Sequence, residues 1–199
     1  MKRQGVLTVI AIGALLFAGS ALSEDEDAGK QLEMMKRWQE ALKLTPQHDE
    51  LKKLIGDWSV TREMKMGGMG AAVEGTATFE WIVPNRWVGS RLKIAMMGMM
   101  TEGFMIHGYD KVKKHWVTAG VSSHHPGLIT TEGPIVDPNG KVQVQYGALD
   151  EFLTDEHDKP LKYVTKWVDD DTFTFELWDL GIGEKGRAVL VDTYTRVKK

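Results

Sequence analysis

Residues 51–64, LKKLIGDWSVTREM, change periodicity in the middle of the stretch. The first four residues end a predicted helical segment. After Gly56 the apolar residues Trp58 and Val60 alternate with polar ones, and this period of two predicts a half-buried β-strand. Similar short stretches follow to the end of the chain, separated by turns rich in Gly, Asn, Asp and Pro.

The remaining alternating stretches predict about ten strands in all. Their expected ranges are 56–66, 73–83, 86–97, 101–109, 115–121, 128–136, 141–152, 161–168, 172–180 and 187–197. No long crossover separates them, which favours an up-and-down antiparallel sheet, and closure avoids the exposed edges of an open sheet. The predicted fold class is therefore all-β, an antiparallel up-and-down barrel of about ten strands with an N-terminal helix.

The first 23 residues have the pattern of a secretory signal peptide. Lys2 and Arg3 give a positive start, and residues 6–17 are almost wholly apolar. In Ala21-Leu22-Ser23, small residues occupy the two positions that a signal peptidase reads. The apolar run is shorter than the ~20 residues that span a bilayer. We expect cleavage after Ser23 and a secreted or periplasmic mature protein.

Composition limits the mature chain further. Removing Lys2 and Arg3 with the leader shifts the formal net charge from −3 to −5. A basic stripe with interleaved aromatic residues is missing from the sequence, so nucleic-acid binding is not expected, and neither is a membrane span in the mature form. The chain has no cysteine, so a secreted domain must rely on its core rather than on disulfides.

Residues 24–55 are expected to form an N-terminal tail and helical segment ahead of a barrel domain at 56–199. A helix over 28–44 has one apolar face, formed by Leu32, Met35, Trp38 and Leu42. This face either binds a partner or membrane, or packs against the barrel, and we favour packing. Thr45 and Pro46 then start a second short helix that ends at Leu54.

Four segments in this order resemble a bacterial family known as domain of unknown function 1579 (DUF1579). They are Met34-Met35 with Trp38, LKKLIGDW at 51–58, Gly108-Tyr109-Asp110 and Tyr194-Thr195-Arg196. The resemblance covers about residues 30–199. It implies a calycin-type or lipocalin-like barrel and no established activity.

The Gly-x-Trp at the start of the first strand is also similar to lipocalins, in which a basic residue of the last strand packs over this tryptophan. Arg196 is at the corresponding place in this sequence. Since the first and last strands of a closed barrel are neighbours, we expect Trp58 and Arg196 to meet. The pair is interpreted as structural barrel closure.

The expected function is binding of a small apolar molecule in the barrel interior. The predicted ligand-binding residues are Phe79, Trp81, Met105, His107, Tyr109 and Trp116. His107 and Tyr109 would orient a polar end of the ligand, and His107 is expected opposite either His115 or Trp116. Arg91 either receives a carboxylate inside or lies in solvent, its default.

Two other functions remain open. The first is soft-metal (copper) binding, because thioethers favour Cu(I) and His124 and His125 are adjacent. The methionines concerned are Met64, Met66, Met69, Met96, Met97, Met99, Met100 and Met105. Lining or filling an apolar interior is the favoured interpretation of these residues. The second is a partner-interaction module with a filled, ligand-free barrel.

No cofactor or catalytic residue is predicted. Ten-stranded haem-binding barrels have a longer glycine-rich motif and a histidine near the C-terminus, whereas the last histidine here is His157, in an expected turn. The sequence has no nucleophile elbow, phosphate loop or paired-carboxylate motif, so an enzyme is not the favoured interpretation.

Overall fold

The computed structural model describes residues 24–65, 72–96, 98–134, 137, 139–151, 155–180, 186 and 188–198. The predicted signal peptide therefore lies outside the described residues. The chain divides into two units, Met1–Leu42 and Lys43–Lys199. No helix within the described ranges is long and apolar enough to cross a membrane.

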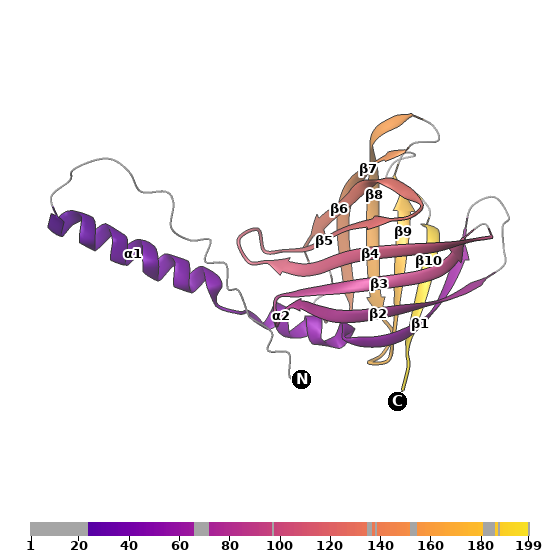
Figure 1. Cartoon of the computed structure of the whole chain (residues 1–199), viewed down its shortest axis with the longest axis horizontal. Coiled ribbons are helices and arrows are strands. Elements are labelled where there is room, and N and C mark those ends of the chain that lie inside the picture. The colour runs from indigo at the N-terminus through magenta and orange to yellow at the C-terminus, as the bar shows by residue number, and fades with distance from the viewer. Residues whose placement is uncertain are drawn as a thin grey trace, which may run out of the picture. The chain divides into compact units, whose positions relative to one another are not determined.

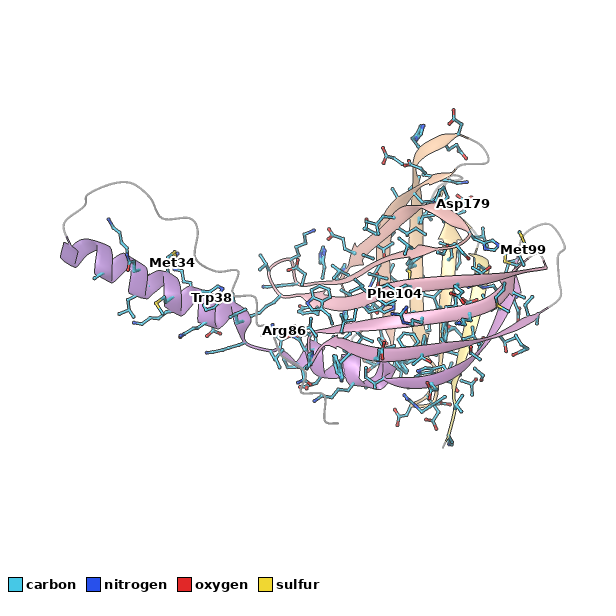
Figure 2. All side chains as sticks on the ribbon, in the orientation of Figure 1. Met34, Trp38, Arg86, Met99, Phe104 and Asp179 are labelled. Carbon is cyan, nitrogen blue, oxygen red and sulfur yellow. The ribbon has the colours of Figure 1, made fainter. Side chains whose placement is uncertain are left out.

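The described part of the first unit is one helix, α1 (Glu24–Leu42). Arg37 Nε donates to Glu33 Oε1 at 3.1 Å, a pair four residues apart on the helix surface. The apolar side chains of Leu32 and Met35 are exposed. That of Trp38 is exposed as well (Figure 2). The expected packing of this face against the barrel stays a prediction.

The second unit is a closed ten-stranded antiparallel barrel (Figure 1), which confirms the predicted fold class. Around the barrel the order is β1-β10-β9-β8-β7-β6-β5-β4-β3-β2, so every consecutive pair of strands is adjacent and β10 closes onto β1. The strands are β1 (Gly56–Met64), β2 (Val73–Val83), β3 (Trp87–Met96), β4 (Met99–Asp110), β5 (His115–Ser122), β6 (His125–Gly133), β7 (Val142–Glu151), β8 (Glu156–Trp167), β9 (Thr172–Asp179) and β10 (Ala188–Arg196).

The alternation in the sequence sets which side chains face inward. In β1, Trp58, Val60 and Arg62 are buried, while Ser59 and Glu63 on the other face are exposed. Successive side chains of a strand point to opposite faces, so the buried set forms one continuous inner face.

Two short helices cover the end of the barrel at which β1 begins. They are α2 (Pro46–Glu50) and η1 (Leu51–Leu54), where one helix was expected. The Thr45 hydroxyl and the His48 ring (Nδ1) are 2.9 Å apart in a capping box that starts α2. Leu51 is only 1% exposed, so η1 inserts a side chain into the core.

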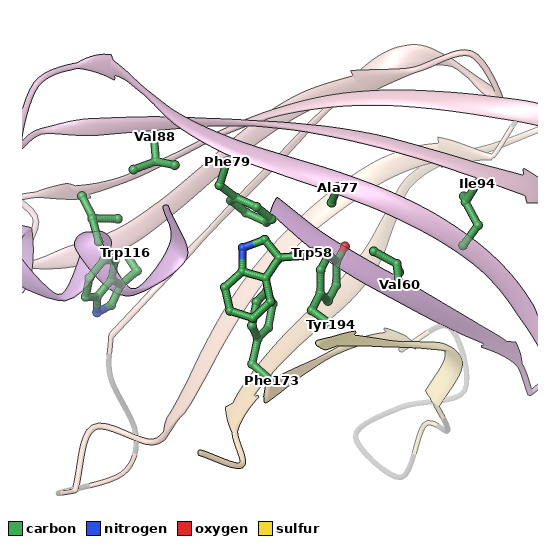
Figure 3. Close-up of a cluster of buried hydrophobic side chains, with 10 residues drawn as sticks. Trp58, Val60, Ala77, Phe79, Val88, Ile94, Trp116, Phe173 and Tyr194 are labelled. Atoms are coloured by element: carbon green, nitrogen blue, oxygen red, sulfur yellow. The ribbon is translucent and has the colours of Figure 1, made fainter. Parts of the chain in front are cut away.

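Trp58 lies among the buried aromatic side chains of the core (Figure 3). Its ring is 4.9 Å from Phe173 and 6.3 Å from Phe79, both in edge-on arrangements. Its Nε1 donates to the Leu54 carbonyl at 2.8 Å, so the indole ties the helical cover to the first strand.

The structure brings Trp58 and Arg196 together. They are paired across β1 and β10, and the guanidinium carbon lies 4.2 Å from the indole centroid. Arg196 also donates to the carbonyl of Ile55 at 2.8 Å and to that of Lys53 at 2.6 Å. This arginine therefore joins the last strand to the first strand and to η1.

Two strands, β6 and β8, begin three or more residues earlier than expected. β6 begins at His125 rather than at 128, because a register shift between Gly120 and Ser122 of β5 accommodates Pro126 and Gly127 within the pairing. β8 begins at Glu156, so that His157 lies near the start of a strand rather than in a turn.

Candidate functional site

The barrel encloses a cavity of about 480 Å³. It extends from Leu51 and Leu54 of the helical cover to His124 and His125 at the far ends of β5 and β6. Apolar side chains from most strands form its wall: Phe79, Leu92, Met105, Trp116, Ile129, Leu149, Trp167, Phe173, Phe175, Leu177 and Leu190. A pocket of this size suits a small organic molecule.

His107 of β4 lies in the wall of the cavity with two hydroxyl groups beside it. Ser90 Oγ is 2.9 Å from His107 Nε2, and Thr118 Oγ1 is 3.4 Å from Nδ1. The Phe79 ring is 5.7 Å away. Burial away from water lowers the pKa of His107 to about 4, so the imidazole is neutral at physiological pH.

This histidine is suited to hydrogen bonding more than to proton transfer. A neutral imidazole offers one N–H donor and one acceptor nitrogen, and each neighbouring hydroxyl can take either role. A general base works best when its pKa is near the pH at which the protein operates. The pKa of His107, about 4, is far below neutral pH.

The register around His107 differs from both predicted alternatives. His107 is opposite Thr118, while Trp116 is opposite Tyr109 and His115 is opposite Asp110. The reason is the loop at 111–114. The Asp110 carboxylate accepts hydrogen bonds from the backbone amides of Val112 and Lys113, which fixes Asp110 as the last residue before the turn. The turn therefore sets the register of the hairpin.

A buried ion pair lies in another part of the cavity wall. Arg62 and Asp192 are directly opposite on β1 and β10, with Arg62 Nε to Asp192 Oδ1 and Nη2 to Oδ2 both at 2.7 Å. Burial raises the pKa of Asp192, although the hydrogen bonds from Arg62 act in the opposite direction. The pKa of Arg62 is raised as well, because the effect of Asp192 exceeds that of the arginine's own burial. The two parallel hydrogen bonds hold the carboxyl group and the guanidinium group together inside the barrel.

Further polar groups come from β5, β6 and β7. Thr131 Oγ1 donates to Gln145 Oε1 at 2.7 Å. Among the described residues, three buried side-chain nitrogens have no hydrogen-bond partner: His115 Nδ1, Trp116 Nε1 and Gln143 Nε2. Trp116 and Gln143 both line the cavity.

The far rim carries the predicted His124-His125 pair. The His124 ring (Nδ1) is 2.8 Å from Thr101 Oγ1, and the His125 ring is 3.1 Å from the Gly127 amide nitrogen and 3.0 Å from the Asp150 carbonyl. Within the part of the chain that is described, no group of three His, Asp or Glu side chains is arranged to hold a metal ion.

Half of the methionines in the copper hypothesis have described side chains. Met64 and Met105 line the cavity, whereas Met99 and Met100 are exposed at the start of β4 (Figure 2). Met66, Met69, Met97 and the side chain of Met96 lie outside the described residues. The described methionines thus separate into cavity-lining and surface positions.

Four of the six predicted ligand-binding residues line the cavity: Phe79, Met105, His107 and Trp116. The other two, Trp81 and Tyr109, lie near the covered end of the barrel and do not line the cavity. Trp81 packs against the core, and Tyr109 makes edge-on contacts with Trp116 at 5.4 Å and His48 at 5.8 Å.

Arg91 lies on the outer face of β3. It is exposed, and its guanidinium carbon is 4.9 Å from the centroid of the Phe104 ring. The alternative that it receives a carboxylate inside the barrel is therefore wrong, and its default position in solvent is confirmed.

The sequence reading missed several polar residues of the wall, above all Arg62 and Asp192. A signal for both was present, because each is on the apolar face of its own strand. Arg62 is two residues after Val60, and Asp192 lies between Leu190 and Tyr194 on the same face.

Together, the ten-stranded closed antiparallel sheet and its interior cavity define a calycin-like, lipocalin-like barrel. The chain belongs to the DUF1579 family, described as protein of unknown function, whose sequence profile matches residues 43–196. The curated proteins contain no match to the chain.

Two solved structures are similar to the chain, and the first of them supports the fold alone. Rv2717c from M. tuberculosis is similar at a TM-score of 0.51 and 13% identity, over 78% of this chain and 100% of that one. A redesigned β-barrel has 12% identity over 74% of this chain and 95% of its own, with a TM-score of 0.39.

Proposed function

We propose that this protein binds one small, largely apolar molecule inside its barrel. The observation that carries the proposal is the cavity of about 480 Å³, whose wall is mostly aromatic and aliphatic. Transfer of apolar ligand surface out of water is worth about 25 cal/mol per Å². At roughly 30 Å³ for each water-sized group, the volume suits a ligand of some 16 non-hydrogen atoms.

The polar groups in the wall support binding in one orientation. His107 with Ser90 and Thr118 forms a hydrogen-bonding cluster in a mostly apolar surface. A few polar groups placed in an apolar pocket fix the position of a ligand more than they add to its affinity.

We also propose that binding takes place outside the cytoplasm, in a secreted or periplasmic protein. The support is the signal-peptide pattern of residues 1–23. The measurement is the mass of the protein recovered from cell fractions, which should begin at Glu24. A chain that keeps its first 23 residues in the cytoplasmic fraction would contradict this.

Gly103 gives a direct test of the cavity. It lies in the cavity wall on β4, and a Cβ there would be no closer than 3.8 Å to its nearest neighbour, the Val121 carbonyl oxygen. Gly103→Phe should fold and occupy part of the cavity, whereas Gly103→Ala adds only one methyl group. Thr76→Phe places the same ring at an exposed position of β2 and is the matched control.

The first assay is a calorimetric titration of each protein with methyl laurate. The second is native mass spectrometry of the protein purified from its exporting cell, which identifies any molecule or ion that remains bound. Gly103→Phe should lower the affinity at least tenfold, while Gly103→Ala and Thr76→Phe stay close to wild type. Equal affinity in all four proteins would place binding outside the barrel. A bound Cu(I) or Ag(I) ion in place of an organic molecule would favour the metal hypothesis.

A further inference from the structure

Tyr163 of β8 and Gln145 of β7 give the cavity wall two polar side chains that are more than nine-tenths buried. Tyr163 is 6% exposed and Gln145 is 7% exposed, and both line the cavity. Within the described part of the chain, neither the Tyr163 hydroxyl nor Gln145 Nε2 has a hydrogen-bond partner. Both atoms nevertheless stay open to water, unlike the unpartnered Trp116 Nε1 and Gln143 Nε2. Buried polar groups are nearly always hydrogen-bonded, so two open groups in an apolar pocket indicate a partner that enters it.

The strand register places these two side chains next to each other. Tyr163 and Gln145 are directly opposite in the β7–β8 pair, and paired residues share one face of the sheet. Side chains at such positions have Cβ atoms about 4.5 to 5.5 Å apart, close enough to contact one bound group. Thr131 of β6 donates to Gln145 Oε1 at 2.7 Å, which occupies the oxygen of the amide and leaves its N–H groups for another acceptor.

Both groups are donors at neutral pH. An amide nitrogen can donate hydrogen bonds and cannot accept them. Burial raises the pKa of Tyr163 to about 12, so the hydroxyl keeps its proton. An oxygen atom with two lone pairs can accept from both donors at once. The pair therefore selects for a hydrogen-bond acceptor.

The charges in the cavity wall argue against an anion at this place. Among the described lining residues, Arg62 is the only arginine or lysine, and it is already bound to Asp192 by two hydrogen bonds. His107 is neutral, so it adds no positive charge. The burial that keeps Tyr163 protonated also disfavours a carboxylate beside it. An uncharged acceptor fits these surroundings better.

We propose that Tyr163 and Gln145 form the polar subsite of the cavity and donate hydrogen bonds to an uncharged oxygen of the ligand, as in a ketone, an ester or an ether. The inference rests on the proposed function and adds the place and the chemical class of the ligand's polar end. The hydrocarbon part of the ligand then lies against the apolar wall, which includes Phe175 and Leu177 beside this subsite.

Three naphthalene probes of similar size separate the contributions to binding. 2-Acetylnaphthalene has a neutral carbonyl, 2-ethylnaphthalene has no polar group, and 2-naphthoate has a charged carboxylate. Wild-type protein should bind the ketone at least as tightly as 2-ethylnaphthalene, although the ketone is the more soluble of the two in water. It should bind 2-naphthoate at least tenfold more weakly than the ketone. Equilibrium dialysis, with each probe measured by its own absorbance, gives the three affinities.

Tyr163→Phe removes one donor and keeps the ring. It should weaken binding of 2-acetylnaphthalene about three- to tenfold, the range of a single hydrogen bond, and leave that of 2-ethylnaphthalene within twofold of wild type. Tyr194→Phe makes the same change at another position of the cavity wall, on β10, and should affect both probes equally. Equal losses for both probes in Tyr163→Phe, or a loss specific to the ketone in Tyr194→Phe alone, would overturn the inference.

Ligand-free protein provides an independent readout. Tyr163→Phe should not lower the melting temperature, because the hydroxyl that it removes has no partner within the described part of the chain. Thr131→Val is the comparison and should lower it, since the Thr131 hydroxyl donates to Gln145. A loss in Tyr163→Phe as large as that in Thr131→Val would show that the phenol is satisfied within the protein and would overturn the inference.

The outcomes separate the two proposals. If 2-ethylnaphthalene binds to wild type more tightly than the ketone does, water satisfies the two donors, and the inference fails while barrel binding stands. Tightest binding of 2-naphthoate would also overturn the inference and would point to an anionic ligand. If none of the three probes binds, the proposed function fails and the inference falls with it.

Discussion

Protonation of His107 should make the barrel sensitive to mild acid. Burial lowers the pKa of this group from 6.5 to about 4 in the folded protein, while the unfolded chain keeps the ordinary value. Between these two values the unfolded chain takes up a proton that the folded chain does not. The free energy of unfolding therefore falls as the pH falls through this window, and the loss is complete below about pH 4.

The size of the effect follows from the two pKa values. One unit of difference corresponds to 1.36 kcal/mol, so the shift from 6.5 to about 4 gives a full effect of about 3 kcal/mol. At about pH 5 the loss should be about 2 kcal/mol, which lowers the melting temperature by about 4 to 8 °C in a domain of this size.

The variant His107→Gln isolates this contribution. Glutamine keeps hydrogen-bonding groups for Ser90 and Thr118 and does not titrate. Urea unfolding of wild type and variant between pH 8 and pH 4 gives the difference in unfolding free energy at each pH. His48, whose pKa is also lowered, mainly by burial and then by Arg86, titrates in both proteins and cancels in the difference.

The difference between the two proteins should be constant above about pH 7 and should shift by about 2 kcal/mol in favour of the variant at about pH 5. Parallel curves across the whole range would refute the reasoning. They would mean that His107 is protonated as easily in the folded protein as in the unfolded chain, and that water reaches the imidazole inside the cavity.

Three further changes test other parts of the structure. Asp192→Asn leaves Arg62 as a buried cation without its counter-ion. It should lower the free energy of unfolding, measured by urea denaturation, by about 3 to 5 kcal/mol. The double variant Asp192→Asn with Arg62→Met should recover part of that loss. Arg196→Ala removes a cation–π contact worth about 0.5 to 2 kcal/mol and should lower the melting temperature without changing ligand affinity; lost binding at unchanged stability would contradict its structural role. Leu51→Ala should cost about 2 to 5 kcal/mol in the same urea assay, and a cost near zero would show that η1 is not part of the core.

The sequence predicted the architecture because the alternation of apolar and polar residues is regular in most strands. In β2, Phe79 and Trp81 alternate in the sequence with Thr78 and Glu80, and the exposure of these side chains follows that period of two. The pairing of Trp58 with Arg196 required only that the first and last strands be neighbours. These features depend on periodicity and chain order, which a single sequence contains.

The inner surface was harder to predict because it depends on register. The partner of His107 was misassigned, since one residue more or less in the adjacent turn changes every pair of the hairpin. Arg62 and Asp192 were overlooked because charged residues are usually exposed, although their positions on apolar strand faces predict burial. Pairing between strands far apart in sequence, which brings Arg62 to Asp192, cannot be read from either strand alone.

Closure of the barrel and the proposed binding depend on different residues. Arg196 packs over Trp58 and fastens the last strand to the helical cover, and neither of these two residues lines the cavity. The cavity wall contains polar groups whose burial costs free energy, which an interior selected for stability alone would replace with packed apolar side chains. A substitution at Arg196 should therefore change stability and spare binding, and one at Gly103 should do the reverse. That separation agrees with the proposed function, because the residues that hold the barrel closed are then not the ones that contact the proposed ligand.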